Sequence, residues 1–316
     1  MLELILFIIG IGLLVKGANW LIDGSSSLAK RLGMSSLVIG LTILAFGTSL
    51  PELIVSLFAA VQGNGDIVLG NIIGSNISNI LLILGISATI MSIRVTRTTT
   101  WKEIPFAFVA VLVLLVFSLA HRLDNVSSTI FRFEGLLLLL FFSIFVYYVI
   151  ELALTTKKHE DIPVKQLPLW KCMLFIILGL AMLFLGGKWV VDGAVFLAQL
   201  LGLSKYIISA TIVAVGTSLP ELVTSVIAMM RKEHNLAVGN IIGSNIFNIF
   251  FILGITTLIT PITISASVVL DIILLLGATL LLFVFLLYPK PHQITRWEGA
   301  LFVLLYIAYV TFLLLR

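Results

Sequence analysis

The sequence predicts an all-α polytopic membrane protein with ten transmembrane helices, arranged as two inverted five-helix repeats. Three observations support this fold class: an apolar composition, a series of long apolar stretches, and a polar motif that occurs twice. The chain has 316 residues, of which 60% are hydrophobic and 11% are charged, whereas a soluble domain has about 25% charged residues. The apolar runs are continuous and about 20 residues long, which is typical of membrane helices and not of barrel strands.

The apolar stretches divide the chain into ten expected spans and a polar centre. The spans are expected at about 2–22, 36–62, 67–92, 104–120, 132–153, 170–196, 205–230, 236–260, 266–288 and 297–315. The longest polar stretch, 154–169, joins a first repeat at 1–153 to a second at 170–316. Each repeat then holds five spans. Because five is odd, the second repeat enters the membrane upside down, as in the inverted repeats of secondary transporters.

The positions of lysine and arginine predict the orientation in the membrane. The odd-numbered loops, counted from the first, hold thirteen of these residues and the even-numbered loops hold three. Loops rich in lysine and arginine stay in the cytoplasm. We therefore expect a protein of the plasma (inner) membrane with a cytoplasmic linker and with both termini outside.

The repeated motif consists of two polar strings in apolar surroundings. AFGTSLPEL at 45–53 returns as AVGTSLPEL at 214–222, and GNIIGSNISN at 70–79 returns as GNIIGSNIFN at 239–248. Both pairs are 169 residues apart, and 26 of the 48 positions of the surrounding stretch are identical between the two copies. Packing alone rarely repeats so many polar residues at one offset, so the two copies together indicate a functional site.

Two glutamates, Glu52 and Glu221, are expected in the middle of their spans. An ionisable residue at mid-membrane depth costs about 2.5–3.5 kcal/mol on insertion scales and is usually functional. Two carboxylates together can neutralise one divalent cation or two monovalent ones. Oxygen ligands suit hard cations such as Ca²⁺ or Na⁺. The four histidines lie outside the expected spans, and the single Cys172 excludes an intramolecular disulfide, so no resident cofactor is expected.

Each glutamate follows a proline, Pro51 or Pro220. Proline has no N–H and clashes with the carbonyl four residues before it. The helix should therefore break there, and carbonyl oxygens in the broken turn can face a cation. Such a break is tolerated in a membrane only where it lines a cavity or is buried in protein.

Other polar residues share faces with the glutamates. Thr48 and Glu52 are four residues apart, as are Ser75 and Asn79 on the next span, so each pair lies on one helix face. Two further pairs have open roles. Asn76 and Asn245 are either ligands or hydrogen-bonding contacts between helices, and Asp23 and Asp192 are either helix caps or parts of a gate. Glycines are expected to let helices approach closely, at positions 70, 74, 85, 239, 243 and 254.

The two strings and their second copies resemble the α-repeats of the cation/Ca²⁺ exchanger superfamily, and within it the prokaryotic Na⁺/Ca²⁺ exchangers. The resemblance covers essentially the whole chain. It implies that Glu52 and Glu221 are carboxylates shared by Ca²⁺ and Na⁺, and that the first span of each half slides to alternate access. It also implies roles for the neighbours: backbone oxygens of Thr48 and Thr217 for Ca²⁺; Ser49, Ser75, Ser218 and Ser244 with the carbonyls of Ala45 and Ala214 for flanking Na⁺; and Asn79 and Asn248 at the centre.

The resemblance also bears on the coupling ion. The Ca²⁺/H⁺ branch carries a different string where this chain has Gly-Thr-Ser-Leu-Pro-Glu, which favours Na⁺ coupling. Some K⁺-dependent relatives have an aspartate where this chain has Asn248, so the amide disfavours K⁺ dependence. The sequence therefore predicts a secondary active antiporter that exchanges Na⁺ for Ca²⁺ by alternating access, and not an enzyme.

Two alternatives stay open: an H⁺-coupled Ca²⁺ or cation antiporter on the same scaffold, and a cation channel with a ring of glutamates. An intramembrane hydrolase would require a nucleophile–base pair, and the spans contain no obvious one. The expected partners are the lipid bilayer and the transported Ca²⁺ and Na⁺. Neither nucleic acid nor an obligate protein partner is expected.

Overall fold

The computed structural model describes residues 2–123, 129–155, 166–200 and 214–315. The described residues form a bundle of helices with four strands of two residues each. In the first half the helical segments are α1 (Leu2–Leu32), α2 (Ser36–Ile39), η1 (Gly40–Leu44), α3 (Ala45–Thr48), α4 (Leu50–Val61), α5 (Gly65–Ile77), η2 (Ser78–Ile83), α6 (Leu84–Ile90), η3 (Thr99–Glu103), α7 (Ile104–Leu123) and α8 (Arg132–Thr155). In the second half they are α9 (Leu169–Leu200), α11 (Ala214–Thr217), α12 (Leu219–Met230), α13 (His234–Ile246), η5 (Phe247–Leu253), α14 (Gly254–Ile259), α15 (Ala266–Leu287) and α16 (Arg296–Leu315).

These helices confirm an all-helical polytopic membrane protein. Eight helices of the described residues are long and apolar enough to cross a membrane, and the bent pair 36–48 and 50–61 gives a ninth span. The remaining expected span is the seventh along the chain, 205–230. It begins outside the described residues, and its second part is the apolar helix α12. The centre of the predicted linker also lies outside them, so the division into 1–153 and 170–316 stays a prediction.

Two of the expected span boundaries were wrong. The first helix continues past the expected end at 22 to Leu32, because Ser25, Ser26 and Ser27 are buried against the rest of the protein. The fourth span begins before 104, since the π-helix η3 continues directly into α7. This earlier start places Glu103, which the expected boundary leaves in a loop, inside the protein with none of its surface exposed.

The expected break in the second span lies at Ser49. Helix α3 ends at Thr48, Ser49 leaves helical geometry with ψ of 8°, and α4 starts with Pro51 in its first turn. The two parts are bent by 46°. Proline is well placed here because the first turn of a helix requires no N–H from it. Ser218 has the same conformation before Pro220, with ψ of 7°, so the second half repeats the break.

In the described part of the chain, three π-helices interrupt the central helices. The π-helices η1, η2 and η5 lie within the second, third and eighth spans. A π-turn inserts one residue into a helix and is often found at functional sites. Segments η2 and η5 contain Asn79 and Asn248, so the insertions occur at equivalent places in the two halves.

Contacts between loops show which ends of the spans share a side. Strand β1 (Ile93–Arg94) pairs with β4 (Gln293–Ile294), and β2 (Thr129–Ile130) pairs with β3 (Ile262–Thr263). The first pair joins the third and ninth loops, and the second pair joins the fourth and eighth. Two other odd loops also meet, since Arg31 Nε donates to the carbonyl oxygen of Leu167 over 2.7 Å. Odd loops thus contact odd loops, as strict alternation of ten spans requires.

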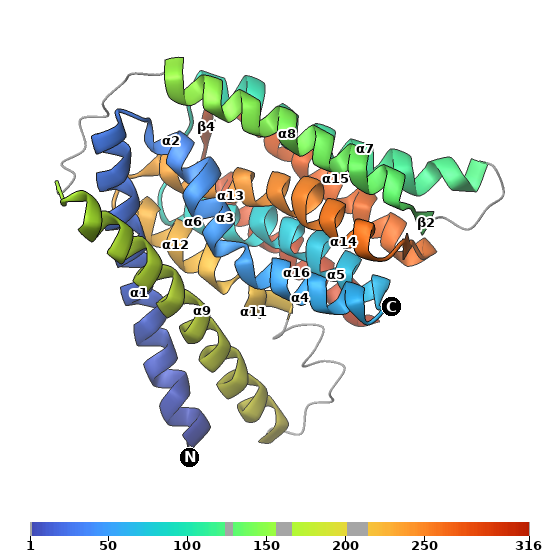
Figure 1. Cartoon of the computed structure of the whole chain (residues 1–316), viewed down its shortest axis with the longest axis horizontal. Helices are drawn as coiled ribbons and strands as arrows, with labels where there is room; N and C mark the ends of the chain where they lie inside the picture. Colours follow the sequence, from blue (N-terminus) through green and yellow to red (C-terminus); the bar gives the residue numbers. More distant parts are fainter. Residues whose placement is uncertain (1, 124–128, 156–165, 201–213, 316) are drawn as a thin grey trace.

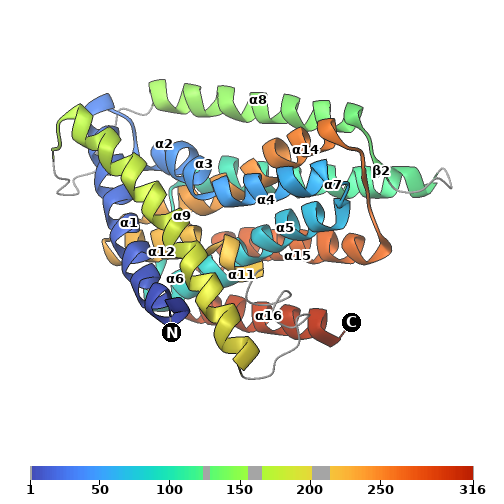
Figure 2. The same ribbon diagram turned by 60° about the horizontal axis from the view of Figure 1, so that its bottom comes forward.

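Helices α1 and α9 pack side by side and extend from the bundle (Figures 1 and 2). Their contact uses glycines. A Cβ on Gly10 would lie 2.9 Å from the Gly186 carbonyl oxygen, and one on Gly17 would lie 2.8 Å from that of Gly179. The numbers rise along α1 as they fall along α9, so the helices are antiparallel. Because Gly179 and Gly186 are the repeat equivalents of Gly10 and Gly17, this α1–α9 seam is reciprocal.

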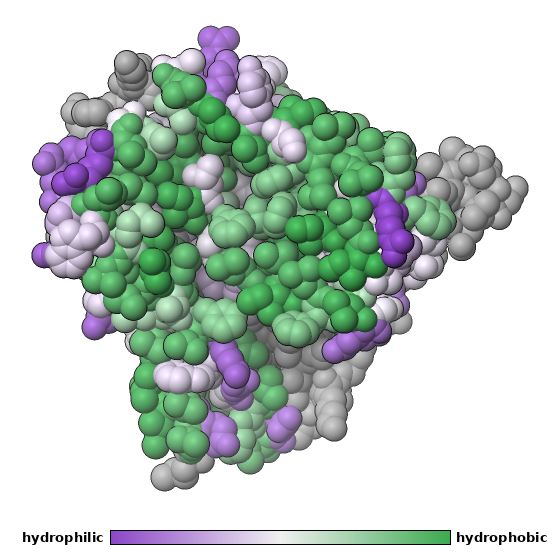
Figure 3. All heavy atoms as spheres, in the orientation of Figure 1, coloured by the Kyte–Doolittle hydropathy of each residue, from purple (hydrophilic) through white to green (hydrophobic). Residues whose placement is uncertain are grey.

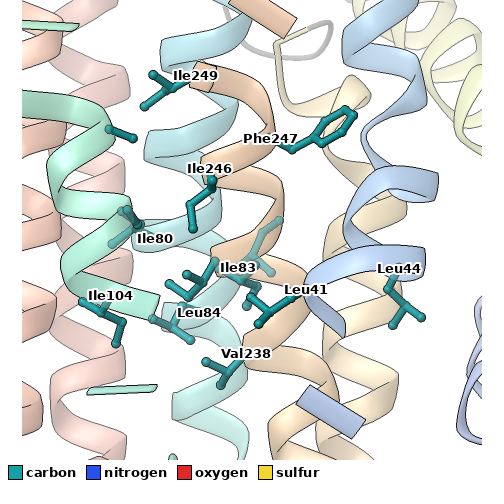
Figure 4. Packing of buried hydrophobic residues seen from close by; sticks show 14 of the residues in the cluster. Leu41, Leu44, Ile80, Ile83, Leu84, Ile104, Val238, Ile246, Phe247 and Ile249 are labelled. Carbon is teal, nitrogen blue, oxygen red and sulfur yellow. The ribbon is translucent and has the colours of Figure 1, made fainter. Parts of the chain in front are cut away.

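The surface and the interior both suit a bilayer. On the face shown in Figure 3, hydrophobic residues cover most of the surface and hydrophilic ones gather toward its edges. Inside, apolar side chains such as Leu41, Ile80 and Ile249 fill the space between the central helices of both halves (Figure 4). The polar residues described next are therefore enclosed by an apolar layer.

Candidate cation site

The two glutamates of the repeated motif lie at the centre of the molecule. Glu52 and Glu221 are each only 1% exposed, and each lies in the first turn of a helix, α4 or α12. The first turn carries the positive end of the helix dipole, which stabilises a carboxylate. The break in each span therefore both exposes backbone near the site and provides a favourable position for the acid.

Serines connect each glutamate to the opposite half. Ser49 Oγ of the first half donates to Glu221 Oε1 at 3.0 Å, and Ser218 Oγ of the second half donates to Glu52 Oε1 at 3.4 Å. Ser75 Oγ also donates to Glu52 Oε1, at 3.2 Å. Three of the four serines predicted for the site thus bond to the two acids, and the contacts of Ser49 and Ser218 are equivalent under the repeat.

Four asparagines link the halves beside the glutamates. Asn76 Nδ2 donates to the backbone oxygen of Asn245 at 3.1 Å, and Asn248 Nδ2 donates to Asn76 Oδ1 at 2.9 Å. Asn79 Nδ2 donates to Asn245 Oδ1 at 2.9 Å. Asn76 and Asn245 therefore form hydrogen-bonding contacts between helices, the structural role that the sequence left open. These contacts hold Asn79 and Asn248 by their NH₂ groups.

Four buried side-chain oxygens at the centre have no hydrogen-bond partner among the described residues. They are the Oε2 atoms of Glu52 and Glu221 and the Oδ1 atoms of Asn79 and Asn248. Buried polar atoms are nearly always hydrogen-bonded, so an unpaired one requires an explanation. These four come in two symmetry-related pairs and are all acceptors. A hard cation is the ligand that such a set of oxygens fits.

A second layer of residues, which the sequence analysis did not single out, supports the site. Asn71 Nδ2 donates to the Glu52 backbone oxygen at 3.1 Å and to Ser56 Oγ at 2.9 Å. Thr217 Oγ1 donates to Asn71 Oδ1 at 3.5 Å. In the other half Thr48 Oγ1 donates to Asn240 Oδ1 at 3.2 Å, and Asn240 Nδ2 donates to Ser225 Oγ at 3.1 Å.

The sequence contains a pattern from which Asn71 and Asn240 could have been predicted to support the site. Asn71 and Asn240 precede Ser75 and Ser244 by four residues, which places them on the same helix faces. Both also lie within the repeated string. They hold the threonines of the motif through side-chain oxygens, so Thr48 and Thr217 are fixed at their hydroxyls.

Ser244, another predicted site residue, lies at the same centre. Ser244 Oγ donates to the backbone oxygen of Ala45 at 3.4 Å, which brings together two groups expected to serve a flanking ion. Ala214 begins α11, and Thr217 ends it. In the described part of the chain, no three His, Cys, Asp or Glu residues form a metal-binding cluster. The site is therefore built mainly of neutral oxygens around two carboxylates.

Three acidic residues outside the site, Asp23, Asp192 and Glu103, differ in exposure and in their contacts. Asp23 Oδ1 lies 2.6 Å from Arg231 Nη1, and Arg231 also donates to Asn19 Oδ1. Its repeat equivalent Asp192 is exposed. The buried Glu103 accepts a hydrogen bond from the hydroxyl of Tyr148. These contacts lie toward the odd loops and not at the centre.

The expected close approach at glycines is confirmed at four of six positions. A Cβ at 85, 239, 243 or 254 would meet a neighbouring helix at 3.1 Å or less. At Gly70 and Gly74 nothing lies within 4 Å of a Cβ among the described residues, and close packing stays a prediction for these two glycines. The residues that pack on Gly239 are Leu37, Gly40 and Leu41, and their repeat counterparts, 206, 209 and 210, lie outside the described residues.

Comparison with known proteins agrees with this fold. The family model described as "Sodium/calcium exchanger protein" matches residues 2–151 and 171–315. The structure superposes on the sodium-calcium exchanger NCX_Mj, soaked with 10 mM Na⁺ and zero Ca²⁺, with a TM-score of 0.85. That match has 32% identity and covers 98% of each chain.

Curated relatives extend over most of the chain as well. The putative antiporter CaxA of Alkalimonas amylolytica is 38% identical over 96% of both proteins. The sodium/calcium exchanger MaX1 of Methanosarcina acetivorans is 30% identical and covers 98% of this chain and 97% of its own length. The inner membrane protein YrbG of Escherichia coli is 36% identical over 81% of this chain and 79% of its own. This chain therefore belongs to the sodium/calcium exchanger family.

Proposed function

We propose that this protein exchanges Na⁺ for Ca²⁺ across the membrane, with both ions competing for one site at Glu52 and Glu221. The observation that carries the proposal is the set of four buried oxygens that have no partner in the described part of the chain, contributed equally by the two halves. Two carboxylates and two amides offer full charge compensation for one Ca²⁺. Two Na⁺ would compensate the same charge, so the two ions can replace one another.

The neighbouring residues supply the remaining ligands in this proposal. Ser49, Ser75, Ser218 and Ser244 would serve flanking Na⁺ with the carbonyls of Ala45 and Ala214, and the backbone oxygens of Thr48 and Thr217 would bind Ca²⁺. The serine hydroxyls that now donate to the glutamates can rotate and offer a lone pair instead. Binding of a cation and rotation of these hydroxyls would then occur together.

Alternating access would come from the α1–α9 pair moving across the rest of the bundle. Glycines allow these two helices to stay in close contact with each other. Against the bundle, the pair lies beside the broken turns: a cavity of about 230 Å³ is lined by Thr48, Pro51, Leu180 and Phe184, among others. A small shift of α9 would therefore change access to the site near Thr48.

The membrane orientation follows from the distribution of charge. The odd loops would face the cytoplasm, and both termini would lie outside. The presence of an inner membrane protein among the relatives supports the same membrane. If more than two Na⁺ exchange for one Ca²⁺, each cycle moves net charge and responds to the membrane potential.

The test is ⁴⁵Ca²⁺ uptake into proteoliposomes loaded with Na⁺, compared with K⁺-loaded and choline-loaded vesicles at one pH. Uptake that depends on an outward Na⁺ gradient is expected. Uptake that ignores Na⁺ but follows an imposed pH gradient would replace Na⁺ by H⁺ as the coupling ion. Flux that needs no counter-ion at all would favour a channel and overturn the antiporter.

A further inference from the structure

We propose that one corner of the odd-loop face binds the headgroup of an anionic phospholipid. The site, which we call the basic corner, is built around the paired strands β1 and β4. Five exposed cations lie on these strands or beside them: Arg94, Arg97, Lys102, Lys290 and Arg296. The proposal concerns lipid binding and does not depend on which ions the protein transports.

The basic corner contains an open groove. Its volume is about 460 Å³, and it is lined by Arg97, Thr98, Trp101 and Lys102. These residues lie in the first two turns of the fourth span, where the chain enters the membrane. Two cations and a hydroxyl around one groove provide the donors that a phosphodiester requires.

Neighbouring helices fix two of the lining residues. The ring of Trp101 packs edge-on against Phe283 of α15, with centroids 5.7 Å apart. The Lys102 ammonium lies 5.4 Å from the centre of the Tyr148 ring of α8. The groove is therefore lined by one segment, 97–102, and two of its side chains are positioned by contacts with α15 and α8.

Three tryptophans place the groove at the level of lipid headgroups. Trp101, Trp170 and Trp297 are each more than half exposed, and each lies at the start of a span on the odd-loop side. Exposed tryptophans at span ends mark the membrane interface. The groove shares one of them, so a headgroup can occupy it while its acyl chains stay in the bilayer.

Among the described residues, few acids compensate the charge of the corner. Glu103 and Glu298 are near in sequence but fully buried; Glu103 accepts from Tyr148, and Glu298 accepts from the backbone N–H of Thr295 at 2.6 Å. The exposed Glu151 interacts electrostatically with Tyr148, whose ring contacts Lys102. Arg97 therefore carries most of the predicted affinity.

An apolar path leads from the groove into the bilayer. Below Trp101, exposed Val109 and Leu112 line α7, and exposed Leu280 and Val284 line α15. Acyl chains can lie along these side chains while the phosphate stays beside Arg97. A soluble anion would gain nothing from this path, which is why we assign the groove to a membrane lipid.

Native mass spectrometry can test the assignment on the intact protein. The purified chain is equilibrated with equal amounts of dioleoyl-phosphatidylglycerol and dioleoyl-phosphatidylcholine, and retained lipid is counted. We expect preferential retention of phosphatidylglycerol. The double variant Arg97→Gln with Lys102→Gln should lose that preference about tenfold or more, since each cation near an anionic surface contributes on the order of 1 kcal/mol.

Matched variants keep the result interpretable. Lys30→Gln with Lys232→Gln removes the same charge elsewhere on the odd-loop side and should retain the wild-type preference, as should the charge-preserving Arg97→Lys with Lys102→Arg. Equal retention of both lipids by the wild type would overturn the proposal, as would a double variant that binds like the wild type. Displacement of phosphatidylglycerol by glycerol 1-phosphate would assign the groove to a soluble anion and also overturn it.

Discussion

At the centre of the molecule each repeat makes the same contacts with the other repeat, whereas at the ends of α1 and α9 the contacts of the two repeats differ. Ser49 donates to Glu221 as Ser218 donates to Glu52. At the odd-loop end of α1, however, Asp23 pairs with Arg231. The equivalent pair in the other half would be Asp192 and Gln62, and a glutamine cannot form an ion pair.

This difference fits a carrier whose site is reached from two sides. A site that binds the same ions from either face benefits from symmetry. The closure of the two faces need not be equal, because resting conformations usually differ in population. The Asp23–Arg231 pair joins α1 to the loop after α12, so in the proposed carrier it would stabilise closure of the odd-loop side. We call it the odd-side latch.

The largest expected effect tests the symmetry of the centre. Glu52→Gln and Glu221→Gln should each reduce Na⁺-driven ⁴⁵Ca²⁺ uptake to background, because each removes one of the two charges that balance Ca²⁺. Glu151→Gln, an exposed acid on α8, is the matched control and should transport normally. Normal uptake by Glu52→Gln alone would show that the two acids are not equivalent and would refute the shared site.

The next effect tests the α1–α9 seam. Gly17→Val and Gly186→Val should both destabilise the protein or slow transport, since even a Cβ meets backbone atoms at 2.8–2.9 Å and overpacking costs about 1–3 kcal/mol. Gly12→Val is the control, because nothing lies within 4 Å of a Cβ there. Thermal unfolding in detergent and uptake rates measure the change. If Gly17→Val and Gly186→Val reduced stability or uptake by clearly different amounts, the two equivalent contacts of the α1–α9 seam would not contribute equally.

A smaller effect is expected at the asparagines between the halves. Asn76→Ala should lower stability by about 1–3 kcal/mol, because it leaves the Asn248 amide without its buried acceptor. Asn245→Ala should lower it similarly by releasing the Asn79 amide. Gln62→Ala, at an exposed position, is the control. A melting temperature unchanged by Asn76→Ala would argue against a structural role for this network.

The smallest effect concerns the odd-side latch. Asp23→Asn should change the apparent Ca²⁺ affinity at the odd-loop face by about fivefold or less, because partly exposed ion pairs contribute about 0.2–1 kcal/mol. Asp192→Asn should change it little. Uptake into vesicles of the two orientations measures each face, and exchanging the charges (Asp23→Arg with Arg231→Asp) should restore the wild-type value. An equal effect of Asp192→Asn would remove the asymmetry between the gates.

Much of the fold could be predicted from the sequence because the repeat carries its own evidence. The lengths of the apolar stretches predicted the spans. Pro51 predicted the break in the second span to within a few residues of its position at Ser49. The pairing of Asn76 with Asn245 could not be predicted, since an amide has many possible partners and the choice depends on which helices meet. Glu103 was predicted to lie in a loop, but the π-helix η3 extends the fourth span to include it. A π-turn could not be predicted because it has no recognisable local sequence pattern.

The reciprocal seam between α1 and α9 has a consequence for ancestry. In it, Gly10 meets the counterpart of Gly17, and Gly17 meets the counterpart of Gly10. Such a contact is what two identical subunits form around a twofold axis. A single five-helix polypeptide, inserted in both orientations, could therefore have assembled through the same glycines as a homodimer before duplication fused the two copies. The differences at the latch would then have arisen after the fusion, when each copy was first able to diverge.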